Sequence, residues 1–112
     1  MARRWQAREH EARVDAIRKM LIWKYRAIVA VTDAGLLRRH GVPRRDTGIP
    51  VGWPDMVAVL DGGRVLFIEV KTGGGAMSRE QTEMAAQMRK RGHTYIVARN
   101  VDDVIEAVEA MA

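Results

Sequence analysis

The stretch D-M-V-A-V-L-D-G-G-R-V-L-F-I-E-V-K at positions 55–71 contains the pattern that decides the fold. Its two arms, 55–60 and 65–71, are rich in Val, Ile, Leu and Phe, which favour β-strands. Between them, Asp61-Gly62-Gly63-Arg64 is typical of the tight turn that joins two antiparallel strands. The stretch therefore predicts a β-hairpin.

Both arms of this hairpin contain charged residues: Asp55 begins the first arm, and Glu69 and Lys71 interrupt the second. A buried carboxylate without a partner destabilises the fold, so these groups must be paired or must be reached by solvent or substrate. Because side chains alternate along a strand, Glu69 and Lys71 lie on the same face. A three-residue turn at 61–63 makes the numbers of facing residues add up to 124, which places Asp55 across from Glu69. A two-residue turn would put Asp55 on the opposite face. We predict the three-residue turn.

Two facing carboxylates repel each other unless a cation lies between them, so Asp55 and Glu69 predict a site for a hard divalent ion. Oxygen ligands without sulfur favour Mg²⁺ or Mn²⁺. A plainer interpretation stays open, in which Glu69 and Lys71 form a salt bridge on an exposed strand and Asp55 is a turn residue after Pro54. The combination of Gly-x-Pro-Asp with Glu-x-Lys favours the metal site.

The sequence before and after the hairpin contains the patterns of further helices and strands. Apolar spacings of three and four predict a helix at 6–25, a β-branched run predicts a strand at 27–31, and turn residues predict a loop without regular structure at 36–53. The later elements are a glycine-rich connection at 72–77, a helix with a Ser78-x-x-Gln81 capping box that ends near Gly92, a strand at 94–98, and a helix at 101–111 capped by Asp102 or Asp103. The order α-β-β-β-α-β-α predicts an α/β fold in which helices flank a small mixed sheet.

The composition is that of one domain, spanning residues 1–112. Apolar residues make up 47% and charged residues 29%, which is typical of a globular protein rather than a disordered chain. No apolar run approaches the ~20 residues of a membrane helix, and the N-terminus lacks the apolar stretch of a secretory signal. The absence of cysteine excludes disulfides, a thiolate nucleophile and Cys-ligated zinc. We expect a cytoplasmic protein that does not bind membranes.

Positive charge is concentrated in the first part of the chain. The protein has 19 Lys and Arg residues against 14 Asp and Glu residues, and 15 of the cations are arginine, whose planar guanidinium suits phosphate. Residues 1–45 hold 12 cations and four anions, a balance of +8, whereas residues 46–112 balance at −3. This asymmetry indicates a nucleic-acid partner or, alternatively, a solvated basic surface. The candidate phosphate contacts lie just before the hairpin and are Arg38, Arg39, Arg44 and Arg45.

Taken together, these motifs resemble the PD-(D/E)xK nuclease superfamily and, within it, the virus-type replication-repair nuclease (VRR-NUC) domain. The resemblance covers positions 48–105 and extends loosely to the first helix. The segments that carry it are Gly52-Trp53-Pro54-Asp55, Gly63-Arg64-Val65, Ile68-Glu69-Val70-Lys71, Ser78 with Gln81, and Gly92. It implies a restriction-endonuclease-like core and an Mg²⁺- or Mn²⁺-dependent endodeoxyribonuclease. Similar short members imply a phage or bacterial cytoplasm and a homodimer that cuts branched DNA, like Holliday-junction resolvases.

The resemblance also implies roles for the charged residues of the hairpin. Asp55 and Glu69 would bind the metal together with the backbone carbonyl of Val70. Lys71 would position the attacking water or help to deprotonate it, and would stabilise the charge that develops on the phosphate. The competing interpretation is a nucleic-acid-binding module without catalysis, in which the basic half holds DNA and the Glu-x-Lys pair is only a salt bridge.

Two further catalytic residues are implied on the helices. Gln81 matches the family's helical glutamine near the lysine, although the capping box alone also explains this residue. The family's glutamate on the first helix is assigned to Glu11, with Glu9 left open.

Three glycines at 73–75 lack the Lys-Ser/Thr of a P-loop, so nucleotide binding is excluded. The histidines show no ligand spacing and are interpreted as surface or packing residues: His10, His40 and His93.

Overall fold

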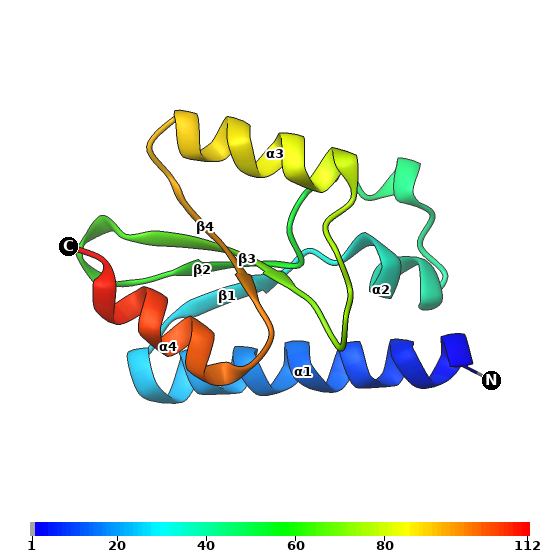
Figure 1. The fold of residues 1–112 in the computed structure, drawn as a ribbon, viewed down its shortest axis with the longest axis horizontal. Helices are drawn as coiled ribbons and strands as arrows, with labels where there is room; N and C mark the ends of the chain where they lie inside the picture. Colours follow the sequence, from blue (N-terminus) through cyan, green and yellow to red (C-terminus); the bar gives the residue numbers. More distant parts are fainter. Residues whose placement is uncertain (1) are drawn as a thin grey trace.

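The computed structural model describes residues 2–112, with side chains described for 6–43 and 45–112 (Figure 1). A mixed sheet runs in the order β1-β2-β3-β4, and its strands are β1 (Ile28–Val31), β2 (Met56–Val59), β3 (Val65–Val70) and β4 (Thr94–Ala98). The first three strands are antiparallel neighbours, whereas β4 runs parallel to β3. The helices are α1 (Ala2–Tyr25), α2 (Ala34–Arg39), α3 (Arg79–Lys90) and α4 (Val101–Ala110). The predicted α/β class is confirmed.

The helices cover the two faces of the sheet unequally, with α1 and α4 below it and α3 above it in Figure 1. On the α1 face, the main core forms around the inward side chains of β3, and its largest fully buried members are Ile17, Leu21, Met56, Leu66, Ile68, Val70, Val104 and Val108. On the α3 face, Phe67 and Trp53 pack against Ala85, Met88 and Tyr95. Because Phe67 faces α3, the alternation of β3 turns Glu69 toward α3 as well.

The hairpin has the predicted register. Met56 pairs with Ile68 and Val57 with Phe67, so the numbers of facing residues add up to 124. The turn, η2 (Asp61–Gly63), is not a regular helix, because Gly62 and Gly63 both adopt φ +73°, a left-handed conformation that glycine takes without a Cβ penalty. Continued by one residue beyond Met56, this register brings Asp55 to the level of Glu69.

Two sequence predictions about regular structure are wrong. Within 36–53, predicted to be a loop, the chain forms α2 and a 3₁₀ turn, η1 (Arg44–Asp46). Asp33 caps α2 by accepting hydrogen bonds from the backbone N–H groups of Gly35 (2.9 Å) and Leu36 (3.1 Å), and a capping aspartate looks like a turn aspartate in a sequence. The cap of α4 is Asn100 rather than Asp102 or Asp103, because the side chain of Asn100 accepts from the Asp103 N–H at 2.8 Å.

The other boundaries differ from the predicted ones by at most two residues, except that α1 begins at Ala2 instead of position 6. The capping box of α3 is present: the Ser78 hydroxyl accepts from the Gln81 N–H, and the Gln81 side chain accepts from the Ser78 N–H. None of the helices in the described part of the chain is long and apolar enough to cross a membrane.

Candidate active site

A cavity of about 480 Å³ opens where the hairpin strands end, between α1, α2 and the first turn of α3. Among the described side chains, the charged ones that are buried are all carboxylates, and all of them line this cavity: Asp33, Asp55 and Glu69. Each is at most 8% exposed. Carboxylates removed from water must be compensated by donors or cations, so their partners define what the cavity can do.

Asp55 is held by hydrogen bonds from the chain on either side of β2, at Val70 of β3 and at Thr32 directly after β1. Its Oδ2 atom accepts a hydrogen bond from the backbone N–H of Val70 at 2.7 Å. Its backbone carbonyl accepts from the N–H of Thr32 at 2.7 Å, and the hydroxyl of Thr32 donates to the carbonyl of Pro54 at 2.9 Å. The carboxylate therefore has a fixed position at the mouth of the hairpin, with one oxygen bound to the backbone of the neighbouring strand.

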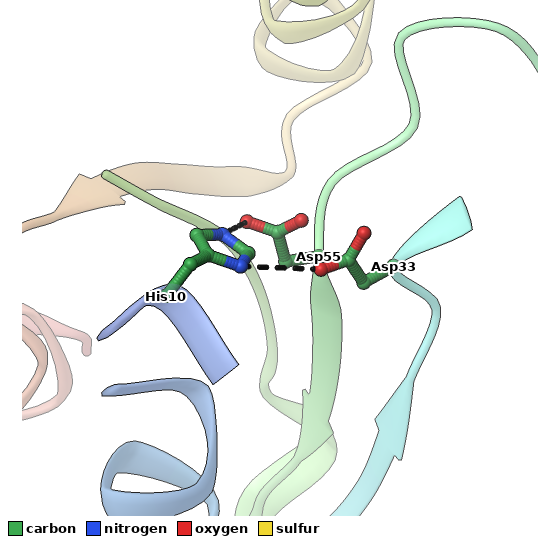
Figure 2. A group of neighbouring side chains, drawn as sticks. All are labelled: His10, Asp33 and Asp55. Atoms are coloured by element: carbon green, nitrogen blue, oxygen red, sulfur yellow. Dashed lines mark hydrogen bonds and ion pairs between the residues drawn. The ribbon is translucent and has the colours of Figure 1, made fainter. Parts of the chain in front are cut away.

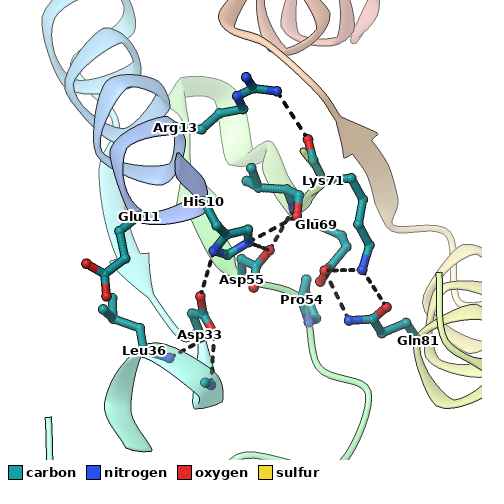
Figure 3. Close-up of polar contacts among 12 residues, drawn as sticks. His10, Glu11, Arg13, Asp33, Leu36, Pro54, Asp55, Glu69, Lys71 and Gln81 are labelled. Carbon is teal, nitrogen blue, oxygen red and sulfur yellow. Dashed lines mark hydrogen bonds and ion pairs between the residues drawn. The ribbon is translucent and has the colours of Figure 1, made fainter. Parts of the chain in front are cut away.

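On the α3 side of the cavity, Glu69, Lys71 and Gln81 each contact the other two (Figure 3). The Lys71 ammonium lies 3.3 Å from Oε2 of Glu69 and donates to Oε1 of Gln81 at 2.9 Å, while Nε2 of Gln81 donates to Oε2 of Glu69 at 3.1 Å. Both explanations for Gln81 left open by the sequence therefore hold geometrically: it completes the capping box and it touches the lysine and the glutamate. The predicted residues Asp55, Glu69, Lys71 and Gln81 line one cavity.

These contacts do not fully compensate the burial of the Glu69 carboxylate. Only 2% of its surface is exposed, and its Oε1 atom is buried with no hydrogen-bond partner among the described residues. Burial, followed by the charge of Asp55, raises the pKa of Glu69 to about 8, and Lys71 only partly opposes this shift. An orphaned carboxylate oxygen beside a second carboxylate fits a bound cation, and the donor set of Asp55, Glu69 and the Val70 carbonyl consists of the oxygen ligands that Mg²⁺ or Mn²⁺ prefers.

Gly52 allows the Gly-Trp-Pro-Asp segment to reach this position. A Cβ atom on Gly52 would lie 2.3 Å from the carbonyl oxygen of Glu80, and the residue has φ +84°. Only glycine combines that conformation with so close a contact. The approach packs the segment that ends in Asp55 against the first turn of α3, which carries Gln81, so two segments that line the cavity meet at this contact.

His10 lies in the cavity, so its interpretation as a surface or packing residue is wrong. Its Nε2 atom is 3.2 Å from Oδ2 of Asp55 and 3.1 Å from the carbonyl oxygen of Val70, and its Nδ1 atom is 3.3 Å from Oδ2 of Asp33 (Figure 2). The hydrogen bond to Asp55 raises the pKa of His10 against the opposing effect of burial. His10 precedes Val14 by four residues and so extends the buried stripe of α1, a signal that was present in the sequence.

The helix-one glutamates are not brought to this cavity. The carboxylate of Glu11 pairs with Arg39, at 3.0 Å from Nη2 and 3.1 Å from Nε, and Glu9 pairs with Arg13 at 3.5 Å. The position on α1 that faces the carboxylates is taken by His10 instead. Among the side chains in contact with the buried carboxylates, the sequence prediction missed His10, and among the buried carboxylates themselves it missed Asp33.

The four arginines predicted to contact phosphate differ in their position relative to the cavity. Arg39 lines it, whereas Arg38 is exposed outside its lining. Arg45 is exposed in η1, and its Nε atom lies 3.8 Å from Oδ1 of Asp46. The side chain of Arg44 lies outside the part of the chain for which side chains are described.

Comparison with known proteins identifies the fold. No family model matches the sequence, and no curated protein matches it. A solved structure described as a "VRR_NUC domain" aligns with a TM-score of 0.64 and 22% identity over 92% of this chain and 98% of that chain. A second, described as a "VRR_NUC domain protein", aligns with a TM-score of 0.54 and 24% identity over 85% of this chain and 84% of that chain. The chain therefore has the restriction-endonuclease-like fold of VRR-NUC domains, as the motifs predicted.

Proposed function

We propose that this chain is a metal-dependent endodeoxyribonuclease that hydrolyses phosphodiester bonds, acting on branched or junction DNA in replication, repair or recombination. The observation that carries this proposal is the buried, unpartnered Oε1 of Glu69, which lies in the same cavity as Asp55 and belongs to a carboxylate in contact with Lys71. Buried carboxylates beside a lysine, at the mouth of a cavity open to solvent, provide both a cation site and a positive group for a phosphate.

Asp55, Glu69 and the backbone carbonyl of Val70 would hold the cation, Mg²⁺ or Mn²⁺. When bound, the cation would neutralise charge on the phosphate and make a nearby water easier to deprotonate. Lys71 is held by Gln81 and Glu69, so its ammonium has a defined position beside the cavity and can orient the attacking water or receive charge from the phosphate. Gln81 acts as a positioning residue for both partners.

The substrate proposed is DNA, because the cavity adjoins the basic half of the chain. Arg39 lies on its wall, and residues 1–45 carry a balance of +8. We place Arg38, Arg44 and Arg45 on the path of the DNA as phosphate contacts. Such contacts set affinity and its salt dependence rather than sequence preference.

A homodimer in a bacterial or phage-infected cytoplasm completes the proposal. One chain of this size has one such cavity in its described part, and two cavities related by a two-fold axis would cut both strands of a junction. An apolar pair on β1 and β2 supports an association surface: Ile28 and Val59 are cross-strand partners and remain 74% and 46% exposed. A monomeric mass by light scattering at assay concentration would remove this part of the proposal.

The test is a cleavage panel of junction, flap, nicked and linear DNA with Mg²⁺ or Mn²⁺. We expect Asp55→Asn, Glu69→Gln and Lys71→Met to abolish cleavage. Lys90→Met, an exposed lysine at the far end of α3, serves as the matched control and should cut like the wild type. Cleavage retained by all three site variants would refute the mechanism. Salt-dependent DNA binding without any metal-dependent product would instead favour a binding module, in which the closed Glu69–Lys71 pair is structural.

A further inference from the structure

A second cavity, of about 240 Å³, lies on the α3 face of the sheet beside the cavity of the candidate active site. Trp53 lines both cavities and precedes Asp55 by two positions. The other lining side chains come from β3, from α3 and from the turn after α3, and they include Phe67, Met84, Met88, Arg91 and His93. We call this second cavity the aromatic pocket. It continues from the active-site cavity along a shared tryptophan.

The aromatic rings of the pocket are arranged edge to face. The ring centroids of Trp53 and Phe67 are 5.7 Å apart, with 90° between the ring planes, and those of Phe67 and His93 are 5.7 Å apart, with 75° between the planes. In an edge-to-face pair, the ring that presents its edge keeps both of its faces free of that neighbour. The two pairs therefore do not use up the stacking surface of the pocket, and Trp53 and Phe67 remain only half-buried.

The volume of the pocket fits one nucleobase. An apolar cavity of about 150 Å³ holds a benzene ring, so 240 Å³ admits a flat ligand of one or two fused rings. Pockets for larger ligands are usually about 300–1,000 Å³. The unbranched side chains of Met84 and Met88 can adapt to either ring size, so the pocket does not require one particular base.

The edge of the pocket is positively charged. Arg91 is exposed, and its Nη1 atom donates to the carbonyl of Gln87 at 3.1 Å, which holds the guanidinium beside the pocket. Among the described residues, no carboxylate pairs with Arg91, and none of the pocket's lining residues is acidic. An apolar side chain of a protein partner would not require this cation, whereas a nucleotide carries a phosphate close to its base. The charge therefore favours a nucleic-acid ligand.

We propose that the aromatic pocket binds one unpaired base of the DNA, close to the phosphate in the active-site cavity. Trp53 would stack on this base, and Arg91 would contact a neighbouring phosphate. Stacking is open to every base, because each has a π-face. The proposal rests on the proposed nuclease function and narrows its substrate to DNA with an unpaired nucleotide at the cleavage position, since such a base enters the pocket without breaking a base pair.

The first test locates the base on the wild-type protein, in EDTA to keep the DNA intact. Junction and flap DNA carry 5-iodouracil at one unpaired position, and irradiation crosslinks this base to an aromatic or methionine side chain that touches it. We expect mass spectrometry to find the crosslink at Trp53, Phe67 or Met84, and to find none when the same base is paired in a linear duplex. Crosslinks only at other residues, equal crosslinking of the paired base, or no crosslink from bound DNA would each overturn the proposal.

Affinity supplies the second readout. Trp53→Leu should reduce the preference for DNA with an unpaired base over paired duplex by about fivefold to a hundredfold, and Trp53→Phe should keep most of that preference. Trp23→Leu is the matched control: this tryptophan near the end of α1 is 77% exposed, and its variant should bind like the wild type. A thermal melt checks that each variant is folded.

Two affinity results would contradict the proposal. The first is an equal loss of affinity by Trp53→Leu for paired and unpaired DNA, which would mean that the tryptophan does not read the unpaired base. The second is a dimer in solution that Trp53→Leu converts to monomers, because a second copy of the chain would then cover the pocket.

The base pocket and the nuclease function fail separately. A protein that crosslinks the unpaired base at Trp53 but cuts no DNA with any divalent cation would retain the pocket and lose the nuclease function. A protein that cuts DNA but crosslinks the base elsewhere would retain the nuclease function and lose the pocket. A protein that binds no DNA would lose both.

Discussion

Replacing Gly52 by alanine should damage the contact between the Gly-Trp-Pro-Asp segment and α3. The added Cβ would lie 2.3 Å from the carbonyl oxygen of Glu80 and 2.6 Å from its carbonyl carbon. Because real Cβ atoms do not approach other heavy atoms within 3.0 Å, the segment must move by about 0.7 Å. That movement separates Asp55, three residues along the chain, from Gln81.

The magnitude follows from two separable effects. Alanine in a left-handed conformation costs about 1–2 kcal/mol, and forcing a group into a packed contact costs about 1–3 kcal/mol more. Gly48 provides the matched control, since it also has a positive φ, +71°, but an added Cβ there meets nothing within 4 Å. Gly48→Ala should therefore show only the first effect, and Gly52→Ala should show both.

The assay is thermal and urea unfolding of the two variants and the wild type. With about 4–6 °C per kcal/mol for a domain of this size, Gly52→Ala should melt roughly 4–18 °C below Gly48→Ala. Its Mn²⁺ affinity should also fall, whereas that of Gly48→Ala should not. If the two variants unfold together and bind Mn²⁺ equally well, the close approach at Gly52 does not determine the geometry of the cavity, and the reasoning is refuted.

Three further perturbations test other parts of the cavity. Since the pKa of Glu69 is raised from 4.5 to about 8, the stability that this carboxyl contributes to the metal-free fold should be fully present below pH 4.5 and be lost as the pH rises toward 8; the difference between wild-type and Glu69→Gln melts across this range should show the loss. Asp33→Ala should destabilise the metal-free protein by about 0.5–2 kcal/mol in urea unfolding, whereas Asp33→Asn should be nearly neutral; equal losses would contradict the role of Asp33 as a cap. Mn²⁺ at about a hundred times its dissociation constant should stabilise the fold by about 2.7 kcal/mol in a melt that EDTA reverses, and an unchanged melting temperature would argue against a metal site.

The hairpin was predictable because its determinants are local. The Asp61-Gly62-Gly63 turn sets the register, and the alternation of side chains then sets which residues share a face with Glu69. The relation of Gln81 to Lys71 was accessible from the sequence only through the resemblance to a family. Composition and periodicity alone identify Gln81 as part of a capping box, which the structure also contains.

The His10 contacts were not predictable in the same way, because they are made across the fold. His10 meets Asp55 over 45 positions and Val70 over 60 positions of the chain, and the contact depends on how α1 crosses the end of the sheet. Spacing along the sequence places His10 on the buried stripe of α1, but it does not identify the residues that His10 contacts. Glu11, assigned through the resemblance, follows His10 by one position, which rotates its side chain by about 100° around the helix axis toward Arg39 and away from the cavity that His10 lines.

These differences bear on how the cavity is assembled during folding. Glu69 and Asp55 come together when the hairpin closes, and the first turn of α3 adds Gln81 from ten residues beyond Lys71. His10 joins only when α1 docks, because its partners lie on the sheet and at the start of α2. A cation that binds Asp55 and Glu69 would therefore stabilise the hairpin, and the contact of Asp55 with His10 would extend part of that stabilisation to the docked helix.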